Sequence, residues 1–154
     1  MAGDNYRDLV ISIAQQTARV CKEDITDQIY KATSGIVQFG PFAGMRLPDE
    51  SSWSGGDGSS KLLGCYEQEL HSTVEKAIAR QPEVLINIGC AEGYYAVGLA
   101  RRLPTAQVFA FDTDEKAQSI CRLAAQLNGV ENQLVIEGEC TQGNRFRLTV
   151  RCVG

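Results

Sequence analysis

The stretch that decides the fold is Val84-Leu85-Ile86-Asn87-Ile88-Gly89-Cys90-Ala91-Glu92-Gly93-Tyr94-Tyr95. Its apolar first part predicts a β-strand over 83–88, and a helical pattern over 93–103 begins directly after the turn that Gly89 and Gly93 bracket. Glycine allows the backbone special dihedral angles and lets a ligand approach closely. A strand, a tight loop and a helix N-terminus in this order are the usual way in which an α/β protein builds a nucleotide site.

Further strands and a helix continue this pattern toward the C-terminus. The predicted elements are a strand over 107–112, a helix over 114–127 and a third strand over 133–137. Pro104 ends the preceding helix, Asp112 lies at the end of the second strand, and Asp114 or Thr113 suits the N-cap of the second helix. The β-α-β-α-β order predicts an α/β fold with a Rossmann-like, three-layer parallel sheet and right-handed crossovers.

The chain upstream of this core predicts an N-terminal helical segment. In order, we expect a helix over 4–33 with a break near Asp24, a short hairpin with strands at 36–39 and 45–47, a loop over 48–60 and a helix over 60–80. The domain organisation we expect is therefore residues 1–82, packed on the core, and residues 83–154, the Rossmann-like part. We expect the two to form one compact unit.

The overall composition argues against several classes of function. The chain has 154 residues and a formal net charge of -4, and it has no cluster of basic residues, so we expect no nucleic-acid partner. No apolar run reaches the roughly 18–20 residues that span a membrane, and no signal peptide is visible, so we expect no membrane partner. Six cysteines without a C-x-x-C pair, beside a single histidine, predict reduced thiols in a cytoplasmic protein and no metal site.

Three segments in order carry a resemblance to a known family. They are 87–95 (NIGCAEGYY), 111–112 (FD) and 137–140 (EGEC), with a looser match at 40–45 and 63–69. In these segments the chain resembles the class I S-adenosylmethionine-dependent methyltransferases, and most closely their FkbM-like branch. The resemblance implies S-adenosyl-L-methionine as cofactor and methyl transfer to the oxygen or nitrogen of a small-molecule acceptor.

The resemblance also assigns cofactor-binding residues. They are Asn87, Gly89, Cys90, Ala91, Glu92, Gly93, Tyr94, Asp112, Thr113, Glu139 and Cys140. In the family the methionine part of the cofactor lies against the loop, the acid in the place of Asp112 holds the ribose hydroxyls, and the residues in the place of Glu139 and Cys140 contact the adenine. Each carboxylate has a structural alternative, since Asp112 can cap the next helix and Glu139 can be a solvated loop acid.

The chain departs from the family pattern inside the first motif. Asn87 stands where much of the family has an acid, so it offers a hydrogen-bond acceptor without the charge. Glu92 can supply that charge, or it can simply be an acid favoured at a helix N-terminus. Ala91 replaces the middle glycine of many members. The G-x-x-x-G spacing does not meet the dinucleotide fingerprint, which argues against a nicotinamide site. No catalytic residue is visible, and His71 is predicted to lie exposed on a helix.

The match ends with the third motif, so the chain looks like the N-terminal half of a methyltransferase domain. Residues 145–153 alternate polar and apolar, which predicts a strand that is an antiparallel partner of the third strand, an edge strand or a swapped strand. The first strand would keep an open edge, which we expect another chain (as in a homodimer) or the N-terminal segment to cover. Two other functions stay open: a catalytically incomplete cofactor-binding or interaction module, and another nucleotide-binding Rossmann-like fragment.

Overall fold

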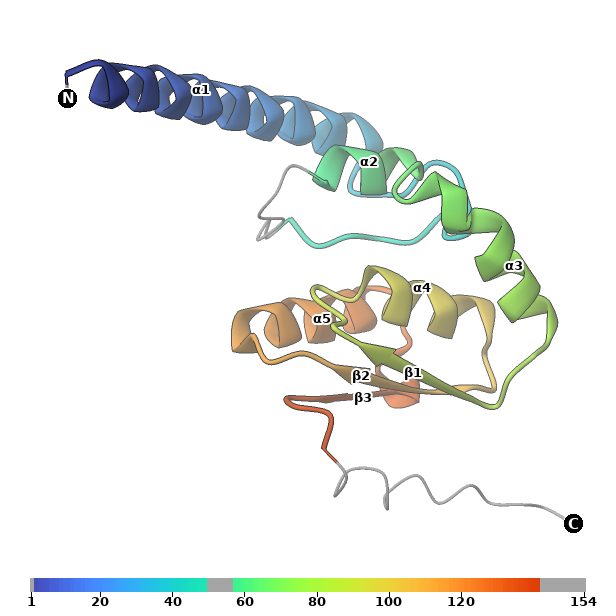
Figure 1. Ribbon diagram of the computed structural model, residues 1–154. Coiled ribbons are helices and arrows are strands. Elements are labelled where there is room, and N and C mark those ends of the chain that lie inside the picture. The colour runs from blue at the N-terminus through green and yellow to red at the C-terminus, as the bar shows by residue number, and fades with distance from the viewer. Residues whose placement is uncertain (1, 50–56, 142–154) are drawn as a thin grey trace, which may run out of the picture. The chain divides into compact units, whose positions relative to one another are not determined.

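The computed structural model of the chain describes residues 2–49 and 57–141, which belong to two compact units that divide between Ser72 and Thr73 (Figure 1). The first unit contains α1 (Ala2–Thr33), α2 (Gly58–Leu63) and a 3₁₀ turn at Gln68–Leu70. The helix α3 (His71–Ala79) begins at the end of the first unit and continues into the second. None of the helices in the described ranges is long and apolar enough to cross a membrane.

The second unit is a β-α-β-α-β array, as the sequence predicts. Its elements are β1 (Val84–Ile88), α4 (Tyr94–Arg102), β2 (Gln107–Phe111), α5 (Glu115–Leu127), a 3₁₀ turn at Glu131–Gln133 and β3 (Leu134–Glu137). The three strands are parallel and lie in the order β1-β2-β3. The predicted α/β class and parallel sheet are therefore confirmed.

Both crossover helices pack on one face of this sheet (Figure 1). Leu85 of β1 packs there with Leu99 and Leu103 of the α4 segment, together with Ile78 of α3. The middle strand and α5 supply the rest of the buried side chains, among them Val108, Ala110, Ile120, Cys121 and Ala124. In the described part of this unit no helix lies on the opposite face, so side chains that alternate with Leu85 along β1 are turned toward solvent.

The predicted helix over 60–80 is wrong in one respect, because the chain breaks it at Gly64. Gly64 has φ +75° and forms the left-handed C-cap of α2, with its N–H donating to the Lys61 carbonyl at 3.1 Å. A Cβ on Gly64 would lie 1.9 Å from the Phe39 carbonyl oxygen. The close approach of these two backbone segments therefore requires glycine, and a continuous helix is impossible here.

The helix α1 lacks the break that was expected near Asp24. It runs unbroken through Asp24, because the Asp24 carboxylate accepts a hydrogen bond from Gln28 at 2.7 Å and Arg19 pairs with Glu23 at 2.8 Å, both one turn apart. The expected hairpin is reduced to an isolated antiparallel bridge between Ile36 and Arg46. Part of the expected loop (50–56) and the expected strand over 145–153 lie outside the described residues.

Candidate functional site

The carboxyl ends of the three strands meet at one edge of the sheet. Ile88, Phe111 and Glu137 are in register, so the loops that follow them, which hold the predicted site residues, start side by side. The Phe111 carbonyl accepts hydrogen bonds from the N–H groups of Gly89 and Cys90 at 2.8 and 2.9 Å, and the Asp112 N–H donates to the Glu137 carbonyl at 3.1 Å. These bonds tie each loop to the neighbouring strand.

The loop between β1 and α4 owes its shape to two glycines with different environments. Gly89 has φ +73°, and a Cβ built on it would meet nothing within 4 Å, so the space beside it is open. Gly93 has φ +91°, and its Cβ would lie 2.5 Å from the Cys121 sulfur on α5. Gly93 is therefore explained by packing against α5, whereas Gly89 leaves room for a ligand to approach the backbone.

Ala91 occupies the middle of this loop with φ +45°, a left-handed conformation that costs a residue with a Cβ about 1–2 kcal/mol. The Ala91 N–H donates to Oδ2 of Asp112 at 2.8 Å. The other carboxylate oxygen, Oδ1, accepts a hydrogen bond from the Asp114 N–H at 2.9 Å. The half-buried Asp112 side chain thus holds the loop after β1 and the loop after β2 together.

The cap of α5 is Asp114, since its side chain accepts a hydrogen bond from the Lys116 N–H at 2.8 Å. The structure thus selects Asp114 from the two predicted caps, and Asp112 is not needed for that role. Each oxygen of the Asp112 carboxylate keeps lone-pair capacity beyond the one bond described. With the open space beside Gly89, this arrangement fits a ligand that presents hydroxyl groups to the end of β2.

The polar and aromatic residues of the first motif flank the same loop. Asn87 lies two residues after Leu85 along β1, so its side chain is on the same, helix-covered face of the sheet, and it is half-buried. Glu92 is buried in the turn before α4. Tyr94 is buried as the first residue of α4 and packs edge-to-face on Tyr95, with ring centroids 5.6 Å apart.

A pair of thiols lies beneath the loop. Cys90 is 5% exposed and Cys121 is fully buried at 0%, and the two side chains are hydrogen-bonded to each other. That bond lowers the pKa of Cys90 and, with burial, raises the pKa of Cys121 far above its ordinary value. The Cys90 thiol also donates to the Ala91 carbonyl at 3.6 Å. The predicted site residue Cys90 therefore has a packing partner that the sequence alone does not indicate.

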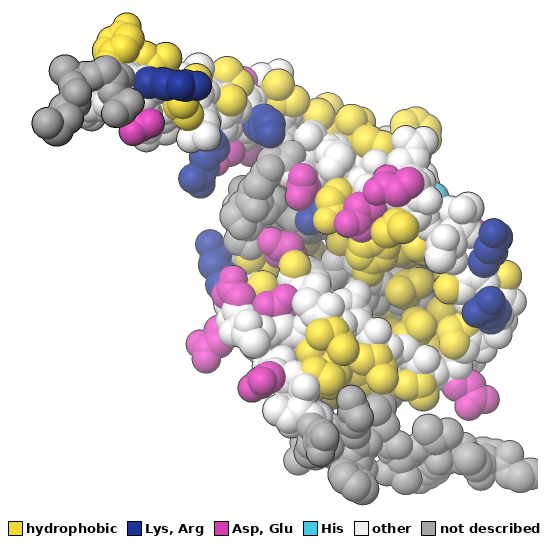
Figure 2. Space-filling model, viewed as in Figure 1, with side chains coloured by type: hydrophobic (Ala, Val, Ile, Leu, Met, Phe, Trp, Pro, Cys, Tyr) yellow, Lys and Arg dark blue, Asp and Glu magenta, His cyan; other side chains and the backbone are white. Residues whose placement is uncertain are grey.

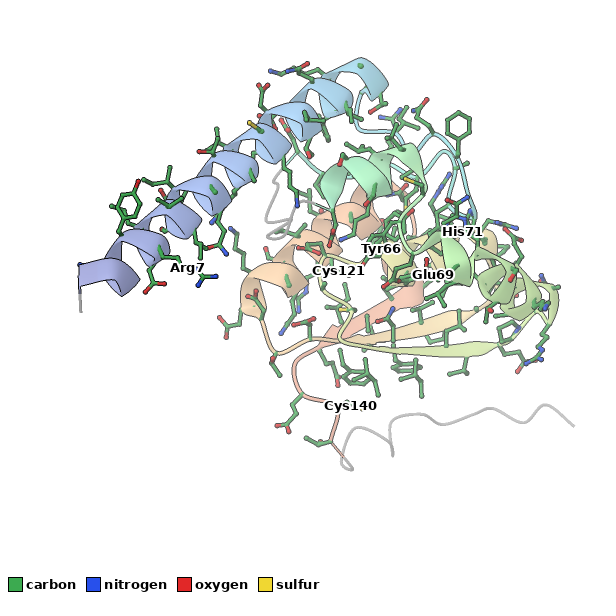
Figure 3. The ribbon with its side chains drawn as sticks, turned by 45° about the horizontal axis from the view of Figure 1, so that its top comes forward. Arg7, Tyr66, Glu69, His71, Cys121 and Cys140 are labelled. Carbon is green, nitrogen blue, oxygen red and sulfur yellow. The ribbon has the colours of Figure 1, made fainter. Side chains whose placement is uncertain are left out.

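The remaining predicted residues, Thr113, Glu139 and Cys140, lie in the loops after β2 and β3. Thr113 and Glu139 are exposed and Cys140 is half-buried. Figure 3 shows Cys140 in the segment that follows β3 and Cys121 on the helix side of the sheet. These three residues therefore follow strand ends at the same edge, but Thr113 and Glu139 are less enclosed than Asp112.

Sequence reasoning missed Gln118 as a residue of this edge. Its Nε2 donates to the Asp112 carbonyl at 2.8 Å, and its Oε1 accepts from Arg122 at 3.1 Å. Arg122 also donates to the Ile136 carbonyl at 3.2 Å. In the sequence, the only sign of this role is that Gln118 and Arg122 lie one turn apart on a helix that is predicted to pack on the sheet.

The looser upstream match lies in the first unit. The Lys61 ammonium lies over the Tyr66 ring, 4.8 Å from its centroid, and His71 Nε2 is 3.1 Å from the Tyr66 carbonyl oxygen (Figure 3). Glu69 is exposed on the 3₁₀ turn that precedes α3. Across the described residues, no group of three or more histidine, cysteine or acidic side chains could hold a metal ion.

Comparisons with known proteins give a fold-level likeness. No family model matches the chain, and no curated protein does. Among solved structures, the chain is similar to a putative O-methyltransferase from Klebsiella pneumoniae (22% identity, 52% of this chain and 37% of that one, TM-score 0.42). It is similar to the O-methyltransferase TomG from Streptomyces achromogenes, solved in complex with SAM (18%, 53% and 37%, TM-score 0.45). It is also similar to cofactor-bound Rv0187 from MTB (16%, 83% and 48%, TM-score 0.47).

Each of these similarities covers only part of this chain and only part of the other chain. The chain spans between 37% and 48% of the length of these three solved structures. At such identities the similarity concerns the α/β fold alone.

Proposed function

We propose that the chain binds S-adenosyl-L-methionine and serves methyl transfer to an oxygen or nitrogen of a small-molecule acceptor. The observation that carries the proposal is the carboxylate of Asp112 at the end of β2, bonded at 2.8 Å to the loop whose Gly89 faces open space. A carboxylate there can accept hydrogen bonds from both hydroxyls of a ribose, while the loop backbone lies against the rest of the cofactor.

In the proposal, the other predicted site residues surround Asp112 and Gly89. The methionine part lies along Gly89, Cys90, Ala91 and Gly93, its ammonium is held by the Asn87 amide and the Glu92 carboxylate, and Tyr94 flanks the loop. Thr113 lies beside the ribose, and Glu139 with Cys140 contacts the adenine. We also propose that this set of residues follows the FkbM-like pattern, and that the chain corresponds to the N-terminal half of such a domain.

The bound cofactor would supply an electrophilic methyl group on its sulfonium. The contribution of the chain is position: the loop would hold the methionine part and Asp112 the ribose, on either side of the sulfonium, so that the methyl group points in one direction. Holding the reactants in line can supply much of the acceleration of such a transfer. The acceptor and any base that takes its proton are not assigned to residues of this chain.

The cellular setting belongs to the same proposal. The cysteines in the described ranges, Cys21, Cys65, Cys90, Cys121 and Cys140, are all free, which supports a cytoplasmic protein. The 154-residue sequence carries a formal net charge of -4, which supports a small-molecule acceptor over nucleic acid.

A second candidate is a binding or interaction module without turnover. The observation that favours it is the exposed edge of the sheet, where Ile88 is 72% exposed. A nicotinamide site is the third candidate, and the G-x-x-x-G spacing disfavours it. Turnover on any acceptor would argue for the enzyme, whereas cofactor binding without turnover would argue for the module.

Calorimetric titration with S-adenosylhomocysteine tests the proposal. We expect the chain to bind S-adenosylhomocysteine, Asp112→Ala to abolish binding and Asp114→Ala to preserve it. Both changes remove a carboxylate after β2, but the Asp114 side chain caps α5 and has no role in the proposed site. NAD is titrated in parallel as the competing ligand class. No binding of S-adenosylhomocysteine at millimolar concentration, or equal loss in both variants, would overturn the assignment of Asp112.

A further inference from the structure

Two cysteines from different elements of the second unit lie in contact inside its core. Cys90 belongs to the loop between β1 and α4 and is 5% exposed, whereas Cys121, labelled in Figure 3, belongs to α5 and is 0% exposed. The Cys121 sulfur lies against Gly93, since a Cβ built on this glycine would be 2.5 Å from it. The Gly93 N–H donates to the Cys90 carbonyl at 2.9 Å. The turn that begins with Cys90 is therefore packed directly on the Cys121 side chain.

The two thiols form a chain of hydrogen bonds that ends on the loop backbone. The side chains of Cys121 and Cys90 are hydrogen-bonded to each other, and the Cys90 thiol donates to the Ala91 carbonyl at 3.6 Å. The bond between the thiols lowers the pKa of Cys90 and, with burial, raises the pKa of Cys121, so Cys121 is the thiol that keeps its proton. Cys90 is therefore the better nucleophile of the two, and Cys121 is in position to react with it afterwards.

The surroundings of the pair favour a small and neutral oxidant. Figure 2 shows acidic side chains at the surface of the second unit. Asp112, Asp114 and Glu139 follow strand ends at the same edge of the sheet as Cys90. Negative charge there repels an anion such as glutathione disulfide, and burial of the sulfurs excludes a large reagent. Hydrogen peroxide is neutral and close to water in size, and a disulfide adds no atoms to the core.

We propose that Cys90 and Cys121 are an oxidative modification site, at which hydrogen peroxide forms a disulfide between the loop and α5. The Cys90 sulfur attacks one oxygen of the peroxide, which gives a sulfenic acid on Cys90 and a molecule of water. The Cys121 sulfur then attacks the Cys90 sulfur, and the hydroxyl group leaves with the Cys121 proton as a second molecule of water. Two thiols are oxidised to a disulfide, and one peroxide is reduced to two waters.

The disulfide would also change ligand binding at the loop, and this part of the inference rests on the proposed function. Oxidation removes both S–H protons, and with them the bond from Cys90 to the Ala91 carbonyl. It also ties the loop covalently to α5. The N–H of Ala91 is the group that holds Oδ2 of Asp112 at 2.8 Å. Oxidation therefore disturbs the carboxylate that is proposed to bind the ribose, and it should weaken the binding of S-adenosylhomocysteine about tenfold.

Peptide mass spectrometry of the full chain tests the modification itself. The folded chain is treated with hydrogen peroxide, the remaining thiols are blocked with N-ethylmaleimide, and the chain is digested without a reductant. We expect the peptides of Cys90 and Cys121 to be linked, with the mass of the two free peptides less two hydrogens, and dithiothreitol to separate them. Linked peptides that form only in urea would overturn the proposal. So would oxidation of the exposed Cys21 and Cys65 while Cys90 and Cys121 stay reduced.

Three variants separate this pair from the other thiols. Cys90→Ser and Cys121→Ser should each abolish the linked peptides. Cys65→Ser removes an exposed thiol of the first unit and should leave them unchanged. Loss of the linked peptides in Cys65→Ser would contradict the assignment. Since the linkage is first measured in the wild type, the test does not depend on whether the two serine variants of the pair fold.

Calorimetry of the oxidised and reduced wild type tests the effect on the loop. We expect the oxidised chain to bind S-adenosylhomocysteine about tenfold more weakly than the reduced chain, and dithiothreitol to restore the affinity. Peroxide-treated Cys65→Ser should behave like the treated wild type. Equal affinities of the oxidised and reduced chains would refute the effect on binding. If the linked peptides form but neither chain binds the ligand, the proposed function fails and the modification site stands.

Discussion

The N–H of Ala91 donates a hydrogen bond to Oδ2 of Asp112, with 2.8 Å between the two atoms. The residues are 21 positions apart, and they come from loops that follow different strands. The bond holds Ala91 in its left-handed conformation and fixes the carboxylate at the end of β2. The shape of the loop and the orientation of the acid therefore depend on each other.

Replacing Asp112 with asparagine should lower the stability of the second unit. The amide offers one oxygen where two N–H groups now meet carboxylate oxygens, so its NH₂ group must face one of those donors. Because Asp112 is half-buried, we expect a loss of about 1–2 kcal/mol in the free energy of unfolding in urea. Glu115→Gln, an exposed change in the first turn of α5, serves as control, and equal midpoints for both variants would contradict the role of Asp112.

Replacing Ala91 with glycine should have the opposite effect. The change removes the cost of a Cβ at φ +45°, which exceeds the entropy that glycine loses on folding. We expect the free energy of unfolding to rise by about 0.5–1 kcal/mol. Ala77→Gly, in the helix α3 of the same unit, should lower it by about 1 kcal/mol. A similar loss at both positions would show that the loop is not strained at Ala91.

A methyl group at Gly93 should be among the most damaging small changes in the second unit. The added Cβ would lie 2.5 Å from the Cys121 sulfur, at a backbone φ of +91°. For Gly93→Ala we expect a loss of about 2–3 kcal/mol. Cys121→Ala in the same chain removes the overlap but not the φ cost, so the double variant should recover part of the loss. Strictly additive effects in this double-mutant cycle would rule out the contact.

The thiols should fall into two reactivity groups. Cys21 and Cys65 are exposed, whereas Cys90 and Cys121 are buried against each other. The raised pKa of Cys121 further keeps that thiol protonated. With iodoacetamide at pH 8 we expect rapid labelling of the exposed pair, and labelling of Cys90 and Cys121 only in urea, as read by peptide mass. Rapid native labelling at Cys121 would mean that α5 does not hold this thiol buried against Cys90.

The local pattern of the sequence predicted the second unit well. The apolar run 84–88, a cap at Asp114 or Thr113 and Pro104 after α4 each act over a few residues, so they can be predicted without knowledge of distant contacts. Asp112 could be placed at a strand end for the same reason. Its bond to Ala91 could not be predicted, because it depends on the register of two strands.

Contacts between distant residues account for what the sequence did not predict. The break at Gly64 follows from the approach of the Phe39 backbone, and the contact of Cys90 with Cys121 follows from how α5 packs under the loop. Gln118 reaches the Asp112 carbonyl only because α5 crosses the sheet at that point. Such features come from tertiary packing, which overrides the local pattern.

The exposure of α1 has a consequence for how the chain opens. Every residue from Asn5 to Ile25 is exposed, so this part of the helix is maintained by its own backbone bonds and by pairs such as Arg19 with Glu23. Such a segment has the lowest free energy of local unfolding in a fold. Its amides should exchange with deuterium first, and trypsin should cut at Arg7, Arg19 and Lys22 while the sheet is still closed to the protease.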